Sequence, residues 1–386
     1  MKVIIRAPLL SVTGYGVHAR QVFAWAISKN WDVYASIVPW GICTYHLDPD
    51  ALDGLIGEVM NRSAPVENPD ISFQVQLPDE WDPELAKVNI GITAGVETNL
   101  CSQAWVDACM KMHMVIVPST FTKKTFVDSG VPPHKIVTIA EAHSHSDEIS
   151  VVLDDQLNAL PTSFNFLMFG QVTGNNPEND RKNTFYALKW LAETFKNDKD
   201  VGIIMKTNLG RFTTADRERS KQMFKKLISE VRQGPYPRFY LAHGMLDNKE
   251  ISTLYANKSV KALLAPTRGE GWGLPILDAA VAGLPVIATD YSGHLDFLRH
   301  IKFLPLDYDI VPIHPSRCDG RIFVEGTAWA DVKEGSFKAR VTKFRKSSVL
   351  PTEWAEAGSE ILKEKFSLAA IKEQYDAFME RIVDDS

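Results

Sequence analysis

Short apolar runs alternate with helix-like segments along most of this chain. In the first half the apolar runs stand at 2–7, 31–38, 71–77, 88–93, 114–118 and 136–139. Between them, helices are predicted at 17–27, 52–60, 103–110 and 119–127, the last capped by Ser119. Buried runs of about four to eight residues, separated by helical periodicity, are typical of strands in a parallel sheet covered on both faces.

The same alternation restarts in the second half. Strands are predicted at 164–170, 202–206, 239–242, 262–266 and 286–289, with helices at 184–195, 215–232, 248–255 and 275–283. Between the halves, residues 148–163 are polar and contain Pro161, so we place a domain boundary there. The expected fold class is α/β, with two doubly wound parallel-sheet domains, 1–158 and 159–367, and a cleft between them.

The last segment predicts one more helix. Apolar residues at helical spacing form a stripe along 368–383: Leu368, Ile371, Tyr375, Phe378, Met379 and Ile382. Such a stripe favours packing against a domain surface.

Composition narrows the class of protein. The 386 residues exceed what one core usually holds, and a net charge of −6 argues against a general nucleic-acid binder, although a local basic groove stays open. The start is too short an apolar run for a signal peptide, so the expected location is cytoplasmic. Four cysteines without metal-ligand spacing (Cys43, Cys101, Cys109 and Cys318) are interpreted as reduced structural thiols.

The stretch 262–296 carries the chemistry. Three glycines (Gly269, Gly271 and Gly273) follow a buried strand, and Pro275 then opens a helix that ends at Gly283. Ligands of parallel sheets bind beyond the carboxyl ends of the strands, where glycine amides and a helix start favour phosphate. Glu270 and Asp278 would suit sugar hydroxyls, so a nucleotide or nucleotide sugar is indicated. The alternative is that Glu270 caps the turn and Asp278 complements the helix dipole.

Other positions leave alternatives open. The turn Gly14-Tyr15-Gly16 could cradle a phosphate or be an ordinary tight turn, and His18 is expected on a helix surface. Glu97 follows the strand 88–93 and is either a ligand-binding carboxylate or a solvated loop residue. The group Glu141, His143, His145 and Asp147 lacks any known metal spacing and is interpreted as a solvated linker.

These residues resemble retaining family-4 glycosyltransferases of GT-B fold. The resemblance rests mainly on the sequence from Gly269 to Pro275, on Asp278 and on 283–288. Weaker landmarks match in order: Val117-Pro118-Ser119, Gly130-Val131-Pro132, Phe169-Gly170, Arg181-Lys182-Asn183 and Met205-Lys206-Thr207. The pair Glu97-Thr98 is similar to one found in a subgroup of these enzymes.

The resemblance implies a donor site for a nucleotide-diphosphate sugar in the second domain and a hydroxyl acceptor, such as a glycan or lipid-linked sugar, on the first. It implies catalytic roles for Glu270, Lys182, Arg181 and Glu97, with the two cations and Lys206 stabilising the leaving diphosphate without a metal or other cofactor. Asp278 would bind the ribose. The remaining donor-binding residues would be Gly14, Tyr15, Gly16, Arg268, Gly271, Trp272, Gly273 and Leu274. The helix at 368–386 would pack back on the first domain.

Two positions depart from the family pattern. The family normally has Glu where Asp278 stands, and often Arg where Gln171 follows Gly170. Asp307-Tyr308-Asp309 is formally an Asp-x-Asp motif, but its context favours an ordinary surface loop.

The predicted reaction is sugar transfer with retention of anomeric configuration. A GT-B epimerase, a phosphorylase, a sugar-binding protein without transfer activity and a DNA-modifying glycosyltransferase are the alternatives. No lysine stands in an obvious pyridoxal context, which argues against a phosphorylase. The net negative charge argues against nucleic acid as a partner. Peripheral contact with a membrane stays an open alternative.

Overall fold

The computed structural model describes residues 1–170 and 176–384. The chain forms two compact units. Unit 1 comprises 1–142, 319–327 and the chain from 366 onward, and unit 2 comprises 143–318 and 328–365. The chain therefore passes between the units several times, and each unit is described below by itself.

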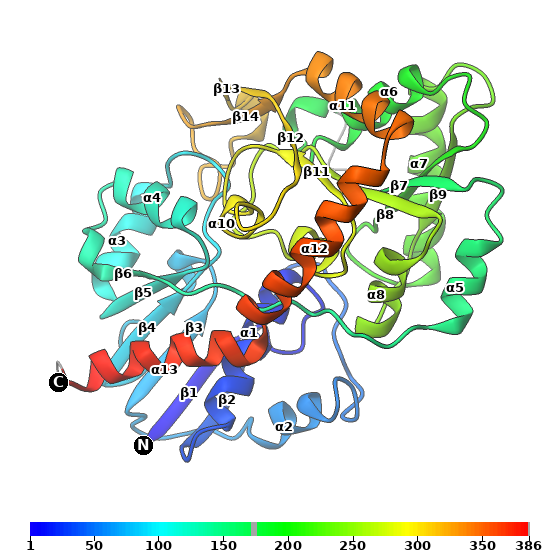
Figure 1. Cartoon of the computed structure of the whole chain (residues 1–386). Helices are drawn as coiled ribbons and strands as arrows, with labels where there is room; N and C mark the ends of the chain where they lie inside the picture. Colours follow the sequence, from blue (N-terminus) through cyan, green and yellow to red (C-terminus); the bar gives the residue numbers. More distant parts are fainter. Residues whose placement is uncertain (171–175, 385–386) are drawn as a thin grey trace. The chain divides into compact units, whose positions relative to one another are not determined.

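Unit 1 is built on a six-stranded sheet in the order β2-β1-β3-β4-β5-β6 (Figure 1). All neighbouring strands are parallel, with Ile4 opposite Tyr34 and Ile5 opposite Phe73. The strands are β1 (Lys2–Ala7), β2 (Asp32–Ile37), β3 (Ile71–Val75), β4 (Val88–Ile92), β5 (Met114–Val117) and β6 (Ile136–Thr138). The helices are α1 (Gly14–Ile27), α2 (Leu55–Asn61), α3 (Gln103–Lys111), α4 (Thr120–Asp128) and α13 (Leu368–Asp384).

Unit 2 has a second six-stranded parallel sheet, in the order β12-β11-β10-β7-β8-β9. Its strands are β7 (Phe164–Phe169), β8 (Val201–Lys206), β9 (Arg238–Ala242), β10 (Val260–Ala265), β11 (Val286–Thr289) and β12 (Leu304–Leu306). The helices are α5 (Val151–Asn158), α6 (Thr184–Thr194), α7 (Thr214–Val231), α8 (Asn248–Ala256), α9 (Leu274–Val281), α10 (Leu295–Leu298), α11 (Glu334–Lys346) and α12 (Val349–Lys365). Unit 2 also contains an antiparallel hairpin, formed by β13 (Tyr308–Pro312) and β14 (Ala328–Val332).

The core of unit 2 explains why this sequence makes buried strands. Phe166, Met168, Ile203 and Met205 point to one face of the sheet and pack with apolar residues of α6, α7 and α11, such as Leu188. Because successive strand residues alternate between faces, a parallel sheet covered on both sides needs apolar residues at nearly every position. The prediction of two doubly wound parallel sheets is confirmed.

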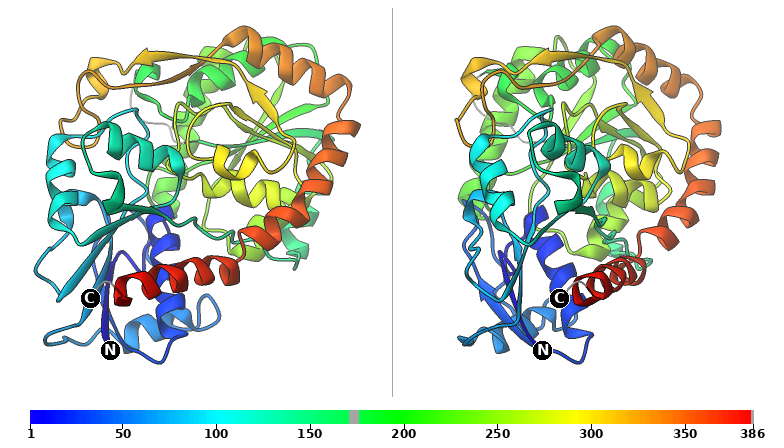
Figure 2. Two further views of the ribbon diagram at one scale, coloured as in Figure 1. Left: turned by 60° about the vertical axis from the view of Figure 1, so that its left-hand side comes forward. Right: turned by 90° about the vertical axis from the view of Figure 1, so that its left-hand side faces the viewer.

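Helix α13 packs on α1 within unit 1, as Figures 1 and 2 show. The Trp25 indole donates to Asp376 Oδ1 at 2.8 Å, and the rings of Trp25 and Tyr375 lie 4.8 Å apart. From the expected apolar stripe, Ile371, Tyr375, Phe378 and Met379 are buried. These contacts fix the helix by both apolar burial and a charge-assisted hydrogen bond.

Residues 148–163, the polar stretch where a domain boundary was expected, are partly helical. Helix α5 belongs to unit 2, buries Leu157 and packs on α8, and the Ser150 amide donates to Thr253 Oγ1 at 2.7 Å. The Asp154-Asp155 pair lies on this helix. Because the helix buries so little apolar surface, its sequence shows little helical periodicity. The first division between the two compact units lies between residues 142 and 143, earlier in the chain than the expected boundary after residue 158.

The Asp-x-Asp motif lies only partly in a loop, since the exposed Asp307 connects β12 to β13. Asp309 is part of β13, opposite Asp331, and its Oδ1 pairs with Lys333 Nζ at 2.8 Å. The expectation of a loop was wrong for Tyr308 and Asp309, because the alternating residues of a short, half-exposed hairpin resemble a polar connection.

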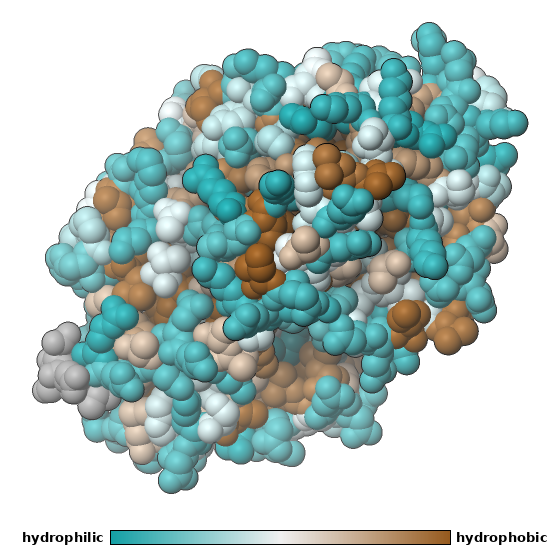
Figure 3. All heavy atoms as spheres, viewed as in Figure 1, coloured by the Kyte–Doolittle hydropathy of each residue, from teal (hydrophilic) through white to brown (hydrophobic). Residues whose placement is uncertain are grey.

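The face shown in Figure 3 is mostly hydrophilic, with small separate hydrophobic areas. Isolated exposed apolar residues of this kind are normal on folded domains. No helix among the described residues is long and apolar enough to cross a membrane.

Candidate functional site

The glycine-rich loop of unit 2 joins β10 to α9 at the carboxyl edge of the sheet. Gly273 precedes the helix with φ 103°, a left-handed conformation that favours glycine, and Pro275 lies in the first turn. The helix ends with Gly283 at φ 74°, and the Leu284 amide donates back to Ala279 O at 3.0 Å. The start and the stop predicted from the sequence are both confirmed.

Glu270 lies in this loop as a buried carboxylate, 6% exposed, between two cations. Its Oε1 is 2.6 Å from Lys182 Nζ and its Oε2 is 3.0 Å from Arg181 Nη1. Burial by itself raises the pKa of this carboxyl, but the charges of Arg181 and Lys182 outweigh burial and hold the pKa well below its usual range. Glu270 is therefore ionised, and two cations share one anion.

The backbone of Glu270 is held by a turn that the sequence analysis did not single out. The Glu270 amide donates to Ser292 Oγ, and the Gly293 amide donates to Glu270 O, both at 2.9 Å. A Cβ on Gly293 would lie 2.1 Å from Gly271 O, so only glycine fits there. The nearby His294 is fully buried, with Nε2 2.7 Å from Thr289 O.

The turn of Ser292 and Gly293 carried a weak sequence signal. Both residues closely follow β11 at the carboxyl end of a strand, where ligand-site residues of parallel sheets are found. A Ser-Gly pair there is also a common turn, so only the tertiary contact with the glycine-rich loop reveals its role.

Arg181 and Lys182 precede α6 and are tied to the glycine-rich loop. Arg181 Nη1 donates to Gly269 O at 2.6 Å, and Arg181 O accepts from the Arg268 amide at 2.8 Å. Asp180 caps this helix start, since its carboxylate accepts from the amides of Lys182 and Thr184. Two loops that are far apart in sequence thus present one cluster of charges.

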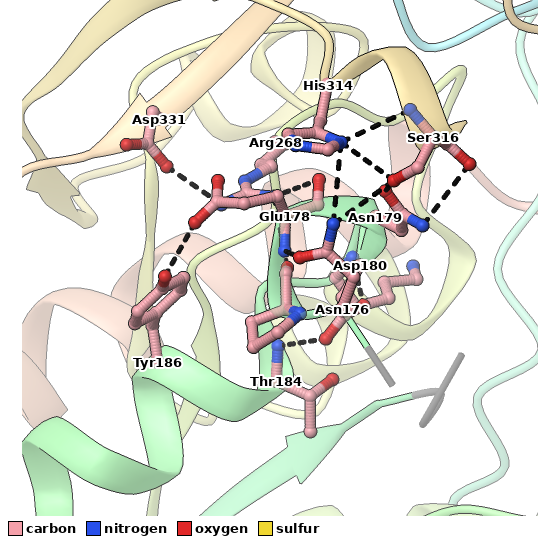
Figure 4. Close-up of polar contacts among 12 residues, drawn as sticks. Asn176, Glu178, Asn179, Asp180, Thr184, Tyr186, Arg268, His314, Ser316 and Asp331 are labelled. Atoms are coloured by element: carbon pink, nitrogen blue, oxygen red, sulfur yellow. Dashed lines mark hydrogen bonds and ion pairs between the residues drawn. The ribbon is translucent and has the colours of Figure 1, made fainter. Parts of the chain in front are cut away.

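Arg268 is the centre of a separate polar network (Figure 4). The residue is 1% exposed, and its Nη2 lies 3.3 Å from Glu178 Oε2 and 3.1 Å from Asp331 Oδ1. Its guanidinium also lies over the Trp329 ring at 5.3 Å. Tyr186 donates to Glu178 at 2.6 Å, and this bond, with burial, raises the pKa of the phenol to about 12. Arg268 therefore joins the segment before α6 to β14, and its donor-binding role stays a prediction.

Asp278 lies inside α9 and is 7% exposed. Its Oδ1 accepts from the Ser144 amide at 2.8 Å. Burial raises the pKa of this carboxyl to about 7, and the bond from Ser144 only partly offsets that effect. Asp278 can therefore gain or lose a proton near neutral pH.

Lys206 ends β8, the strand beside β7. Its ammonium donates to Gly244 O and lies 5.2 Å from the centre of the Phe212 ring. Burial lowers the pKa of this amine to about 8.

A small cavity of about 20 Å³ adjoins the charge cluster of Glu270 and Lys182. It is lined by Phe169, Lys182, Glu270, Gly273 and neighbouring residues of β10 and α9. A cavity of this size holds a water molecule and not a sugar ring.

The glycine turn at the start of α1 is tightly packed within unit 1. Thr13 caps the helix by accepting from the Gly16 amide, and a Cβ on Gly16 would lie 2.0 Å from Ser11 O. Tyr15 Oη lies 2.9 Å from Thr93 Oγ1, and its ring stacks on Trp40 with centroids 4.4 Å apart. These contacts give the turn a structural role, and its role toward a donor stays a prediction.

Glu97 lies after β4, in the same part of unit 1. Its charge acts on the Tyr15 phenol, whose pKa burial raises. The catalytic role assigned to Glu97 stays a prediction.

His18 and Glu141 are both buried, so the expectations of a helix-surface histidine and a solvated glutamate were wrong. His18 is 2% exposed, with Nδ1 3.6 Å from Glu141 Oε1 and Nε2 3.3 Å from Tyr375 Oη. Burial lowers the pKa of His18 to about 4. The packing of α13 on α1 covers this face, which the sequence of α1 alone did not show.

The other members of that polar group belong to unit 2. His145 Nε2 lies 3.4 Å from Asp147, and Lys363 Nζ lies 3.2 Å from the same carboxylate. Within 1–170 and 176–384, no group of three or more metal-ligating side chains is placed to hold an ion. Gln171, the second departure from the family pattern, lies outside the described residues.

Part of unit 2 matches a known protein family. Residues 182–304 match the family model described as glycosyl transferases group 1. This segment contains Lys182, Lys206, the glycine-rich loop and the Ser292 turn. No curated protein sequence gives a significant match.

Solved structures share the architecture at low sequence identity. Anabaena HepE in complex with UDP-glucose superposes with a TM-score of 0.66 at 13% identity, covering 99% of this chain and 100% of that one. Sucrose-phosphate synthase from Thermosynechococcus elongatus gives 0.64 at 14% identity, covering 100% and 99%. Pneumococcal GtfA, an O-GlcNAc transferase, gives 0.51 at 15% identity, covering 81% of this chain and 57% of that one. The fold of the chain is therefore GT-B.

Proposed function

We propose that the protein is a glycosyltransferase whose unit 2 binds a nucleotide-diphosphate sugar. The observation that carries this proposal is the buried Glu270 held between Arg181 and Lys182 at the carboxyl edge of a parallel sheet. Lys182 and Glu270 also lie in the segment that matches glycosyl transferases group 1. The GT-B fold and neighbours in complex with UDP or UDP-glucose support the same donor class.

The charge balance of the cluster suits a diphosphate. Arg181 and Lys182 both pair with the Glu270 carboxylate, so two cationic side chains meet at one point of the sheet's carboxyl edge. Donor phosphate oxygens would accept charge-assisted hydrogen bonds from these cations, and Glu270 would be freed to accept from the donor sugar. The same cations would stabilise the diphosphate as it leaves, so the proposed reaction needs no metal ion.

Asp278 is proposed to bind the ribose. An ionised carboxylate accepts both hydroxyls of a diol, and the Ser144 amide occupies one of its oxygens in this structure. The acceptor, a hydroxyl of a glycan or of a lipid-linked sugar, is assigned to unit 1.

The sugar is proposed to move with retention of anomeric configuration. A departing phosphate oxygen would take the proton of the acceptor hydroxyl on the same face of the sugar, without a protein nucleophile. The anomeric configuration of the product, read by NMR, tests this step, since a β linkage from an α-linked donor would disprove it.

Thermal shift measurements with UDP-, GDP-, ADP- and dTDP-sugars test the donor class, because a ligand that binds only the folded protein raises its melting temperature. Sugar release and transfer to a panel of glycan acceptors then test turnover. The exchange Lys182→Met should abolish both the shift and turnover, whereas Lys302→Met, elsewhere in unit 2, should change neither. Unchanged turnover in Lys182→Met would remove the proposed site.

One observation favours a second candidate, a sugar-nucleotide-binding protein without transfer activity. Asp278 is shorter than the glutamate usual in the family and is already bonded to Ser144. Calorimetric binding of a nucleotide sugar, with no transfer to any acceptor and no hydrolysis, would support this candidate.

A further inference from the structure

Lys206 stands between two loops of unit 2. Its ammonium donates to Gly244 O, in the segment 243–247 between β9 and α8. The Phe212 ring lies on another side of it, in the segment 207–213 between β8 and α7. Among the described residues, its ammonium thus contacts a carbonyl oxygen and a ring face, and both contacts depend on where these loops lie.

One buried hydrogen bond joins the segment 243–247 to α7, and through Asp216 to the segment 207–213. His243 Nε2 lies 2.7 Å from Asp216 Oδ2, with side chains that are 3% and 10% exposed. Asp216 stands in the first turn of α7 and also accepts from the Leu209 amide at 3.2 Å. The His243 ring meets the Phe212 ring edge-on, with centroids 6.1 Å apart. Each loop therefore contacts this pair and also contacts Lys206.

We propose that His243 and Asp216 are positioning residues, whose hydrogen bond holds the loops 207–213 and 243–247 around Lys206 and directs its ammonium group to the donor diphosphate. The inference rests on the proposed function and deepens it. Lys206 ends a strand at the carboxyl edge of the sheet, where ligands of this fold class bind. A partly buried cation held in place loses little freedom when it meets a phosphate, so its fixed position strengthens binding.

The partial burial of Lys206 also predicts how diphosphate binding depends on pH. Burial brings the pKa of its amine to about 8, while Glu250 on α8 acts in the opposite direction. Diphosphate affinity should therefore fall as the pH rises through about 8, because Lys206 loses its proton. If the loops separate, water reaches the amine and its pKa moves up toward that of an ordinary lysine, so the fall in affinity moves to higher pH.

The test is calorimetric binding of UDP, GDP and ADP, and of the matching nucleosides, from pH 6.5 to about 10 to the full-length protein. His243→Phe keeps an aromatic ring at this position and removes the hydrogen bond. We expect it to weaken binding of the preferred nucleoside diphosphate about tenfold at pH 7, to leave nucleoside affinity within about twofold, and to move the alkaline fall upward. His243→Gln, whose amide can replace Nε2 as the donor, should restore most of the affinity. His300→Phe, at an exposed histidine of unit 2, should change nothing.

The outcomes separate the two proposals. A wild-type protein that binds none of the three diphosphates would remove the proposed function and this inference with it. Diphosphate binding whose pH profile is the same in wild type and His243→Phe would remove this inference alone. Lys206→Ala supplies the double-mutant cycle, since His243→Phe should cost no further diphosphate affinity once Lys206 is absent. If His243→Phe does not fold, Asp216→Asn weakens the same bond, and a wild-type profile in it would equally overturn the inference.

Discussion

Glu270 Oε1 and Lys182 Nζ lie 2.6 Å apart, although the two residues are 88 positions apart in sequence. The carboxylate is buried, and its second oxygen meets Arg181. Removing one partner from such a cluster leaves charge that is neither paired nor fully hydrated. This relationship supports the first prediction.

Glu270→Gln should abolish sugar transfer and lower the free energy of unfolding by about 1–3 kcal/mol at pH 7. The pKa of Glu270 is depressed in the folded state, so the carboxylate contributes stability above its unfolded pKa, and the contribution is lost as the pH falls through the folded pKa. Urea unfolding at pH 7 and pH 3 should show a smaller difference from wild type at pH 3. The exposed pair of Glu334 and Lys338 supplies the control, Glu334→Gln, with an expected change below about 0.5 kcal/mol. An equally stable Glu270→Gln protein would contradict the prediction.

Asp278→Asn should change how stability depends on pH. The folded pKa of about 7 lies above the ordinary value of 3.8, so the folded protein binds the proton more tightly than the unfolded chain. The stability contributed by the protonated carboxyl is full below pH 3.8 and is lost as the pH rises through about 7. The neutral amide has no such loss, so Asp278→Asn should gain about 2–4 kcal/mol on wild type between pH 4 and pH 8.

Urea unfolding at several pH values measures this gain. The same substitution at the exposed Asp290 is the control, for which we expect parallel curves. Parallel curves for Asp278→Asn would show that burial does not shift this carboxyl as described.

Gly293→Ala should destabilise unit 2 by about 2–4 kcal/mol and remove activity. The added Cβ would lie 2.1 Å from Gly271 O, a backbone atom that can move only if the glycine-rich loop moves with it. Gly335→Ala, on α11 with no heavy atom within 4 Å of the added Cβ, is the matched control. There we expect no loss, or a gain of about 0.5–1 kcal/mol. Melting temperatures and donor thermal shifts of both variants decide the prediction, and two equally stable variants would count against the tight turn.

Arg268→Lys should act on stability more than on donor binding. A lysine cannot span Glu178 and Asp331 and also donate to Glu178 O, so the buried positive charge at position 268 would lose part of its pairing. We expect a loss of about 2–3 kcal/mol in unfolding free energy, with nucleotide affinity of the folded protein within about threefold of wild type.

Lys182→Met should show the opposite pattern, with strongly reduced nucleotide affinity and a smaller loss of stability. Calorimetry below the unfolding temperature distinguishes the two. A large loss of affinity in Arg268→Lys without destabilisation would favour the donor-binding role predicted from sequence.

Much of the fold follows from local sequence. The apolar runs predict all strands of the first sheet and every strand of the second except β12, since burial on two faces leaves few polar positions in a parallel strand. Gly273, Pro275 and Gly283 fix the limits of α9 through backbone preferences that need no distant partner. The hairpin β13–β14 and helix α5 were missed because short, half-exposed elements carry little periodicity. Helices α10, α11 and α12 were also not predicted.

The sequence by itself determined the parallel-sheet architecture and the position of Glu270 at a strand's carboxyl end, because both depend on periodicity and turn chemistry. Only the tertiary structure decided which charges meet. It pairs Glu270 with Arg181 and Lys182. It also pairs Arg268 with Glu178 and Asp331, and it places the Ser144 amide within hydrogen-bond distance of Asp278. Such contacts depend on how loops from different strands converge. That convergence is set by packing across the whole sheet, and no local pattern records it.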